Sequence, residues 1–346
     1  MRIPAAALPA WVRGLLEGAG LEAGAAGTVA EALVETSLRG VDSHGIARVP
    51  VYADRLRAGG INPRPVPRVV RSSGSVALVD GDGGPGHVAG RFAMDRALEL
   101  AADGGVGVAC VFASNHFGAA ATYVLRAARA GCVGMAMTNA DVLVVPYGGA
   151  APALGTNPIA FAAPLPDGGV FELDMATSQV AMNRVFNARD EGRAIPSDWA
   201  VDADGAATTD PGAAAAGVPL GGYKGYALAL MVEVLCGVLA GAAVGRDVGR
   251  LYGADAEGQR AGHFLLALDP ERLVGRERFE TLLAGLLSDV RSVPVAPGAD
   301  EVLVPGEPEA RARAERERDG VPVEPELWGT LRALGDQLGV SAPPTV

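Results

Sequence analysis

The sequence predicts an α/β fold in which helices cover a β-sheet. Between residues 75 and 140, short apolar runs alternate with longer segments whose apolar residues recur at helical spacing. The chain has 346 residues, of which 49% are hydrophobic and 20% are charged, so it can bury a sizeable core. This length predicts two or three domains.

The N-terminal part of the chain predicts helices. Residues 8–40 have apolar positions at helical spacing and predict two of them. A third helix should begin near Val49, because Pro50 fits the first helical turn and would disrupt a later one. Ser43 and His44 are then expected in the turn that precedes this helix.

The remaining chain predicts strands and helices in alternation, with a mostly irregular stretch at 190–222. Strands are expected where short apolar runs occur, at 75–80, 106–114, 134–140, 158–165, 170–177 and 262–269. Helices are expected where the periodicity is helical, at 89–105, 121–134, 226–244, 276–292, 307–320 and 324–340. The highly charged stretch 307–320 should be a solvated helix.

Charge and cysteine usage exclude several classes of protein. The net charge is -11, and no Arg-rich tract interleaves with aromatic residues, so we expect no nucleic-acid partner. Cys110, Cys132 and Cys236 form no CxxC pair, which predicts buried, reduced thiols in a cytoplasmic protein. The N-terminus predicts a short amphipathic helix and not a signal peptide.

The apolar stretch 226–244 raises the alternative of a membrane protein. A helix needs about 20 apolar residues to cross a bilayer, and this stretch is nearly that long. Glu233 lies at its centre, and Gly237 and Gly241 weaken it as an isolated helix. The sequence therefore favours a helix buried against the sheet, and no membrane contact is expected.

The turn after the first predicted strand has the spelling of a dinucleotide-binding fingerprint. Gly81, Gly83 and Gly86 have the spacing GxGxxG between a strand and a helix. However, Pro85 removes an amide from the loop, and the next strand ends without the acidic residue that would hold a ribose. The sequence therefore favours a plain glycine turn over a Rossmann site.

Two of the four histidines occupy similar polar turns. His44 lies in "DSHG" and His116 lies in "SNHFG". Imidazole exchanges protons near neutral pH, so the pair predicts an acid/base site, although either residue alone would favour a structural role. His263 precedes an apolar strand and is expected to be structural, whereas the role of His87 stays open.

Arg48 and Tyr52 continue the spacing that begins at His44. The three residues are four positions apart, so a helix would place them along one face. The planar guanidinium of Arg48 suits a substrate carboxylate, and a surface salt bridge is the alternative.

Two further positions could contact an anionic ligand. Asp174 ends an apolar strand and could orient a catalytic group, bind a ribose or cap a helix. Lys224, the only lysine, precedes a helix expected to start near Tyr226, whose N-terminus would suit an anion. No metal-binding motif is present, so no metal is expected.

The motifs occur in the order "DSHGIARVPVY", "SNHFGAAATY", "LGTNPIAFAAP", "LDMATS", "IPSDWAVDADGAATTDP", "GGYKGYALAL" and "VLVPGEPE". Together they resemble the type-2 malate/L-lactate dehydrogenase family across nearly the whole chain. The resemblance implies a three-layer α/β fold that is not the Rossmann fold, with a mixed sheet and a helical subdomain built from both termini. It also implies a homodimer, with the active site between domains near the subunit interface.

The resemblance also implies domain boundaries. A helical subdomain with the SHG motif is expected at 1–74 plus 306–346, and a small α/β segment at 75–122 plus 293–305. The cofactor-binding α/β domain is expected at 123–292.

The implied activity is NAD(P)-dependent interconversion of a 2-keto acid, or cyclic imino acid, with the matching 2-hydroxy or amino acid. In that reaction His44 or His116 transfers the proton, Arg48 holds the carboxylate, and Ser43 and Tyr52 hydrogen-bond the substrate or an imidazole. The residues implied to contact NAD or NADP are Asp174, Met175, Ala176, Thr177, Ser178, Tyr223, Lys224, Gly225, Pro305, Gly306 and Glu307.

Substrate contacts are expected from Asp141, Thr156 and Asn157, the last two in the tight turn "GTNPIAF". After "TN" the chain has Ala140 and Asp141, whereas ureidoglycolate-type members have a lysine, which argues against ureidoglycolate as substrate. Asp141 would disfavour a second carboxylate and favour a cationic iminium or amine, unless it is a solvated turn residue. A catalytically silent, nucleotide-binding member of the same fold is the alternative function.

Overall fold

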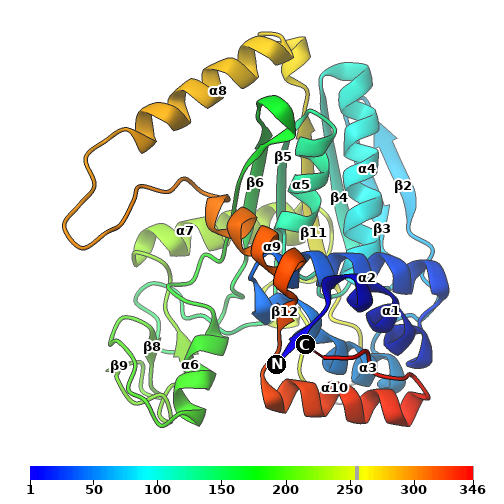
Figure 1. The fold of residues 1–346 in the computed structure, drawn as a ribbon, viewed down its shortest axis with the longest axis vertical. Helices are drawn as coiled ribbons and strands as arrows, with labels where there is room; N and C mark the ends of the chain where they lie inside the picture. Colours follow the sequence, from blue (N-terminus) through cyan, green and yellow to red (C-terminus); the bar gives the residue numbers. More distant parts are fainter. Residues whose placement is uncertain (254–256, 346) are drawn as a thin grey trace.

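The centre of the protein is a seven-stranded mixed sheet, and the computed structural model describes residues 1–253 and 257–345. The strands are β2 (Arg68–Ser73), β3 (Val76–Asp80), β4 (Val106–Ser114), β5 (Val133–Thr138), β6 (Ile159–Pro164), β7 (Val170–Met175) and β11 (Ala261–Leu268). Their order is β2-β3-β4-β11-β5-β6-β7 (Figure 1). Neighbouring strands are antiparallel except for the parallel pair β3 and β4.

Helices cover both faces of this sheet. On one face lie α4 (Gly86–Gly104) and α5 (Ala121–Arg129), and on the other lies η5 (Glu233–Val238), a π-helical continuation of α7 (Tyr223–Val232) (Figure 1). Successive side chains of β4 point to opposite faces of the sheet, so Val111 packs toward α4 and Cys110 packs toward η5. The predicted three-layer, non-Rossmann fold with a mixed sheet is confirmed.

The glycine turn between β3 and α4 is used for packing. The amides of Gly81 and Gly83 donate to backbone carbonyls at the end of β4, at 2.9 and 2.8 Å. A Cβ on Gly86 would lie 2.2 Å from the carbonyl oxygen of Asn115, so this position requires glycine. The turn therefore joins two strands of the sheet, in agreement with the expected plain turn.

Both termini contribute to one helical core beside the sheet. It contains α1 (Leu8–Gly18), α2 (Ala23–Leu38), α3 (Val49–Ala58) and α10 (Pro325–Leu338), and the rings of Trp11 and Trp328 lie 5.5 Å apart within it. Strand β1 (Arg2–Ile3) pairs with β12 (Val321–Pro322), which brings the two chain ends close together (Figure 1). The charged helix α9 (Glu307–Asp319) forms an ion pair with α2 through Arg313 and Glu35.

Several elements differ from the sequence prediction. Strand β2 was not expected, since all its residues are exposed at the sheet edge and give no buried pattern. Helix α6 (Met182–Asp190) was also missed. The stretch 190–222 contains the short strands β8 (Ala200–Val201), β9 (Ala207–Thr208) and β10 (Ala216–Gly217), which form a small sheet.

The helix expected at 226–244 is shorter and less buried than predicted. It starts at Tyr223, turns π-helical at Glu233 and ends at Val238, and the turn that follows contains Gly241, whose φ of +69° suits glycine. One face of α7 and η5 contributes Cys236 to the core. The other face exposes the apolar side chains of Leu228, Leu230, Met231, Val234, Val238 and Leu239. No described helix combines the length and apolar character needed to cross a membrane.

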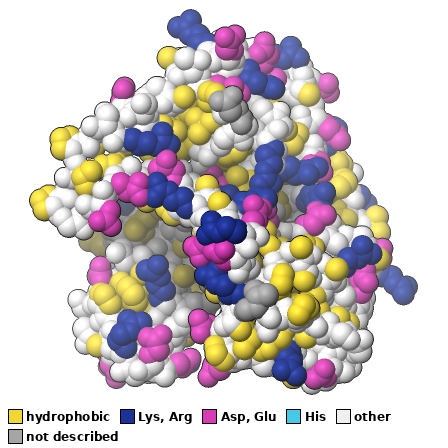
Figure 2. Space-filling model, in the orientation of Figure 1, with side chains coloured by type: hydrophobic (Ala, Val, Ile, Leu, Met, Phe, Trp, Pro, Cys, Tyr) yellow, Lys and Arg dark blue, Asp and Glu magenta, His cyan; other side chains and the backbone are white. Residues whose placement is uncertain are grey.

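Helix α8 (Arg276–Arg291) projects at one side of the molecule, and an irregular segment leads from it back to α9 (Figure 1). Its side chains Leu282, Leu286 and Val290 are exposed. Elsewhere, acidic and basic side chains are interspersed on the face drawn in Figure 2. The predicted burial of the three cysteines is confirmed.

Candidate active site

One cavity of about 1100 Å³ brings together segments that are far apart in the sequence. It lies between the turn before α3, the loop after β4, the end of β7 and the segment that leads into α9. The residues expected at the site that line it are Ser43, His44, Arg48, His116, Asp141, Thr156, Asp174, Met175, Ala176, Ser178, Pro305 and Gly306.

The two turn histidines meet inside this cavity. The rings of His44 and His116 are stacked, with centroids 5.7 Å apart and planes at 24°. The hydroxyl of Ser43 lies 2.9 Å from Nδ1 of His44. Burial lowers the pKa of His44 to about 4, assisted by the charge of Arg48, and lowers the pKa of His116 well below its usual value. Both imidazoles are therefore neutral at neutral pH.

The hydrogen bonds of His116 determine which of its ring nitrogens carries the hydrogen. Nδ1 lies 2.7 Å from the Tyr52 hydroxyl, and the backbone N–H of Gly118 points at the same nitrogen at 3.4 Å. A backbone N–H can only donate, so Nδ1 is the acceptor and the single ring hydrogen lies on Nε2. The backbone of His116 is held in turn by the side-chain oxygen of Gln259, at 2.9 Å.

The glycines that follow the two histidines are required by close packing. Gly45 lies against α2, and a Cβ there would come 2.0 Å from the hydroxyl oxygen of Ser37. Gly118 has a φ of +71°, and a Cβ there would come 2.4 Å from Nε2 of His87. The glycine spacing that singled out these turns in the sequence therefore has a structural cause.

The other two histidines lie outside the cavity lining. His263 bonds to Thr138 and Ser114, both at 2.7 Å, and stacks on a phenylalanine ring, as expected of a structural residue. His87 is buried edge-on against the Tyr52 ring, with centroids 5.5 Å apart. Neither of its ring nitrogens has a partner among the described residues, and burial lowers its pKa to about 3.

Arg48 is buried at one end of the cavity. Its Nη1 donates to the hydroxyl of Tyr252, and its guanidinium carbon lies 5.6 Å from the centre of that ring. Nε of Arg48 has no partner in the described part of the chain. Asp141 faces the same end and accepts the Leu251 N–H at 3.4 Å, and burial raises the pKa of its carboxyl group.

Tyr252 lines the cavity but was not predicted from the sequence as a site residue. It contacts Arg48 although 204 positions separate the two residues, and no local motif marks it. The sequence therefore gave no signal that could have found it.

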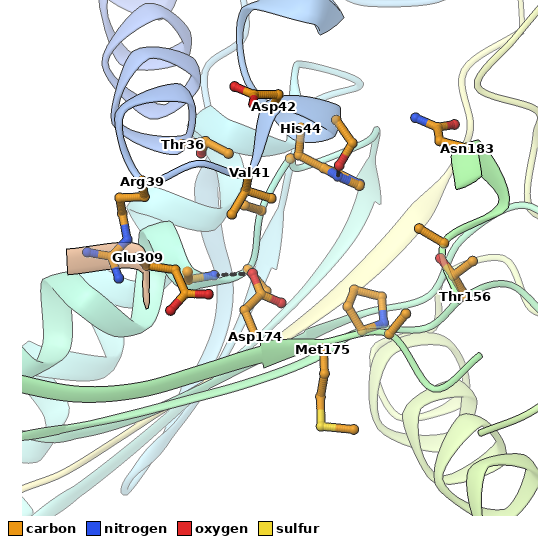
Figure 3. Close-up of a pocket in the computed structure, with 18 of the residues that line it drawn as sticks. Thr36, Arg39, Val41, Asp42, His44, Thr156, Asp174, Met175, Asn183 and Glu309 are labelled. Carbon is orange, nitrogen blue, oxygen red and sulfur yellow. Dashed lines mark hydrogen bonds between the residues drawn. The ribbon is translucent and has the colours of Figure 1, made fainter. Parts of the chain in front are cut away.

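Acidic residues gather at another part of the cavity. Figure 3 shows Arg39, Glu309 and Asp174 together, with His44 beyond them and Thr156 farther away. Asp174 accepts the backbone N–H of the first residue of α5 at 2.8 Å, so it caps a helix supplied by another segment. Desolvation by the surrounding protein atoms raises the pKa of the Asp174 carboxyl group to about 6, and the charge of Glu309 contributes to this shift.

A buried ion pair lies next to these residues. Arg39 donates to Oε1 of Glu172, and both side chains are at most 9% exposed. Oε2 of Glu172 has no partner among the described residues. The guanidinium of Arg39 is therefore already paired with a carboxylate.

The family model for malate/L-lactate dehydrogenase matches residues 3–332. The chain belongs to the malate/L-lactate dehydrogenase family. It is 37% identical to the NAD⁺-dependent ureidoglycolate dehydrogenase of Escherichia coli K12 over 313 residues, which are 90% of each chain. The predicted family is confirmed.

Solved structures of dehydrogenases and a reductase share the fold. The sulfolactate dehydrogenase of Methanocaldococcus jannaschii superposes with a TM-score of 0.91 at 36% identity, covering 99% of this chain and 98% of that one. The Δ1-piperideine-2-carboxylate reductase of Pseudomonas syringae gives 0.86 at 30% identity, covering 96% and 99%.

In this member of the malate/L-lactate dehydrogenase family, some expected site residues lie behind the cavity wall. Tyr52 is buried behind His116. Thr177 is buried and donates through its hydroxyl to the carbonyl oxygen of Thr156 at 3.1 Å. Asn157 is fully buried and donates to the carboxylate of Glu233 at 3.0 Å, so it supports the turn and does not face the cavity.

A second group of expected cofactor residues lies outside the cavity of this family member. Tyr223 and Lys224 are exposed in the first turn of α7, which begins three residues earlier than expected. Gly225 packs where a Cβ would lie 2.5 Å from backbone atoms of Leu220. Glu307, the first residue of α9, accepts the backbone N–H of Val304 at 2.8 Å and so holds the segment that leads into this helix.

Proposed function

We propose that the protein is an NAD(P)-dependent oxidoreductase that interconverts a 2-keto acid, or a cyclic imino acid, and the matching 2-hydroxy or amino acid. The observation that carries this proposal is one cavity lined by two neutral imidazoles and by the buried guanidinium of Arg48. An imidazole can move a proton at the carbonyl oxygen or the imine nitrogen, and a guanidinium can hold the neighbouring carboxylate. Membership of a dehydrogenase family supports the same reaction class.

The residues present fit a dinucleotide. The cavity is large enough, at about 1100 Å³, and Gly306 lets the segment before α9 pack closely on Glu172 at its edge, since a Cβ there would come 3.0 Å from the Glu172 side chain. Asp174 is exposed on this wall, where its carboxylate can accept a hydrogen bond from a ribose hydroxyl. Asp174, Met175 and Pro305 would hold the cofactor here. When bound, the nicotinamide supplies or accepts a hydride.

In reduction, His116 is proposed to give the proton. Its Nε2–H is the free donor of the ring, because Nδ1 is occupied by Tyr52 and the Gly118 amide. Tyr52 acts as a positioning residue that holds this tautomer. In the reverse reaction His116 accepts the proton from the substrate hydroxyl. His44, paired with Ser43, is the second candidate for proton transfer, and its ring lies against that of His116.

Arg48 is proposed to bind the substrate carboxylate, because it lines the cavity and its charge lies close enough to His44 and His116 to lower the pKa of both. Asp141 lies at the same end and would repel a second carboxylate. This favours a monocarboxylic keto acid or a cationic imino acid. The piperideine-2-carboxylate reductase, similar in fold, is named for an imino acid of this kind.

The protein is also proposed to act as a homodimer in the cytoplasm. The outer face of α7 and η5 leaves Val234, Val238 and Leu239 at least 54% exposed, which is a large apolar surface for a single chain in water. A second copy of the chain would cover it. Light scattering after gel filtration should give twice the mass of one chain, and a monomeric mass would contradict this proposal.

A substrate screen tests the proposed activity. NADH and NADPH oxidation would be followed by stopped flow with pyruvate, oxaloacetate, phenylpyruvate and piperideine-2-carboxylate. Turnover of at least one of these acids is expected. Silence across the panel despite measurable binding of either dinucleotide would favour the alternative, a catalytically silent nucleotide-binding member of the family.

A further inference from the structure

Two hollows meet at Arg48 and Tyr252. The main cavity has a volume of about 1100 Å³, and a second, shallower hollow of about 760 Å³ lies beside it. Arg48 and Tyr252 line both of them. The rest of the second hollow is formed by Ala47, Pro50, Val51, Asp54, Arg57, Ala58 and Gly253. The two shared side chains therefore form the partition between the hollows.

The Tyr252 side of the partition is held in place by contacts of the neighbouring residue Leu251. Leu251 is buried in the helical core, and its N–H donates to the Asp141 carboxylate at 3.4 Å. These contacts fix the backbone next to Tyr252, while the Tyr252 side chain itself is 49% exposed. Its hydroxyl accepts from Nη1 of Arg48, and its ring lies beside the guanidinium. The ring can therefore be removed without opening the hydrophobic core.

From this geometry we infer that Tyr252 sets the upper size limit of the acid that the enzyme takes. The inference rests on the proposed function, in which Arg48 holds the carboxylate. The substituent on the carbon next to that carboxylate must then fit in the same end of the cavity. Tyr252 is the part of the partition that can be changed without losing the carboxylate-binding group.

The hydroxyl of Tyr252 has a second role at this position. Because it accepts a hydrogen bond from Arg48, its own hydrogen is available to a carboxylate oxygen that Arg48 holds. The ring limits size, and the hydroxyl adds one contact to the acid. Small acids such as pyruvate should therefore be preferred over phenylpyruvate, whose ring would have to lie against the Tyr252 ring.

The test compares kcat/KM for pyruvate and phenylpyruvate in the wild type, Tyr252→Ala, Tyr252→Val and Tyr252→Phe. Tyr252→Ala and Tyr252→Val open the partition. In both variants the ratio of kcat/KM for phenylpyruvate to kcat/KM for pyruvate should rise by about tenfold or more, which is the range that a changed pocket wall produces. Tyr252→Phe keeps the ring, so it should raise the KM for both acids and leave their ratio unchanged. Asp54→Ala enlarges only the second hollow and should not change the ratio.

The outcomes separate this inference from the proposed function. A wild type that reduces pyruvate, with a ratio that shifts in Tyr252→Ala and Tyr252→Val alone, supports both. An active wild type with the same ratio in all variants overturns the size limit and leaves the proposed function in place. Equal loss on both acids in the two small variants also overturns it, since Tyr252 would then only support Arg48. A wild type that is inactive on every acid overturns both.

Discussion

The region around His44 and His116 and the region around α7 differ in how far contacts within one chain hold them. The turns that carry His44 and His116 are held within one chain by hydrogen bonds, in which Gln259 accepts the His116 amide and Ser37 accepts the Ile46 amide. Around α7, by contrast, Lys224 is exposed and the neighbouring apolar side chains face outward. The proton-transfer side is therefore preorganised in a single chain, whereas we propose that the side carrying Lys224 becomes a site only when a second copy packs against it.

The largest effect is expected at the preorganised side. His116→Ala should lower kcat by about a hundredfold or more, because positioned proton transfer contributes two to four powers of ten in rate. His44→Ala should produce a loss of the same class if that ring shares the proton transfer. Steady-state kinetics with circular dichroism would check this, and near-wild-type turnover in both variants would contradict the proton-transfer roles.

The second expected effect is on stability. Gly45→Ala places a methyl group 2.0 Å from the Ser37 hydroxyl oxygen, so the turn and α2 must move apart. We expect the free energy of unfolding to fall by about 1–3 kcal/mol, the usual cost of overpacking. Urea unfolding measures it. Gly27 lies on α2, and a Cβ there would meet open space, so Gly27→Ala serves as the control. Equal stability of both variants would show that the Gly45–Ser37 contact does not hold the turn against α2.

The third prediction concerns acid. The folded-state pKa of His87 is about 3, below its unfolded value, so only the unfolded state takes up a proton as the pH falls from about 6.5 toward 3. Stability should therefore decrease with falling pH in this window. His87→Gln should reduce the slope of the unfolding free energy against pH by about one proton. Urea unfolding curves of both proteins at several pH values give this slope. The same slope of unfolding free energy against pH in both proteins would contradict the burial of a neutral His87 ring.

The smallest effect is expected at the exposed side. Lys224→Arg should weaken NADH binding by about three- to tenfold, because a planar guanidinium replaces a compact ammonium group. Fluorescence titration of NADH gives the dissociation constant, with Lys224→Gln as the comparison that removes the charge. Unchanged binding in both variants would mean that Lys224 does not reach the cofactor.

Much of this arrangement could be predicted from the sequence. Apolar periodicity marked β3 to β7 and α4, and the repeated glycine after His44 and His116 marked both turns. Strand β2 and helix α6 were missed because neither has a clear apolar pattern.

Contacts between distant segments could not be predicted. Tyr252 meets Arg48 only after the chain has folded. Asn157 was expected at the substrate, but in the fold its amide supports Glu233. Sequence patterns report burial along one element, whereas these contacts depend on how elements are placed in three dimensions.

The binding position of a small acid tests the proposed roles of Arg48 and His116 most directly. A crystal structure of the complex with NADH and oxamate, an unreactive analogue of pyruvate, would show this position. We expect the oxamate carboxylate on the guanidinium of Arg48 and its amide oxygen within hydrogen-bond distance of Nε2 of His116. An oxamate bound elsewhere, with Arg48 and His116 both free of it, would contradict the central claim.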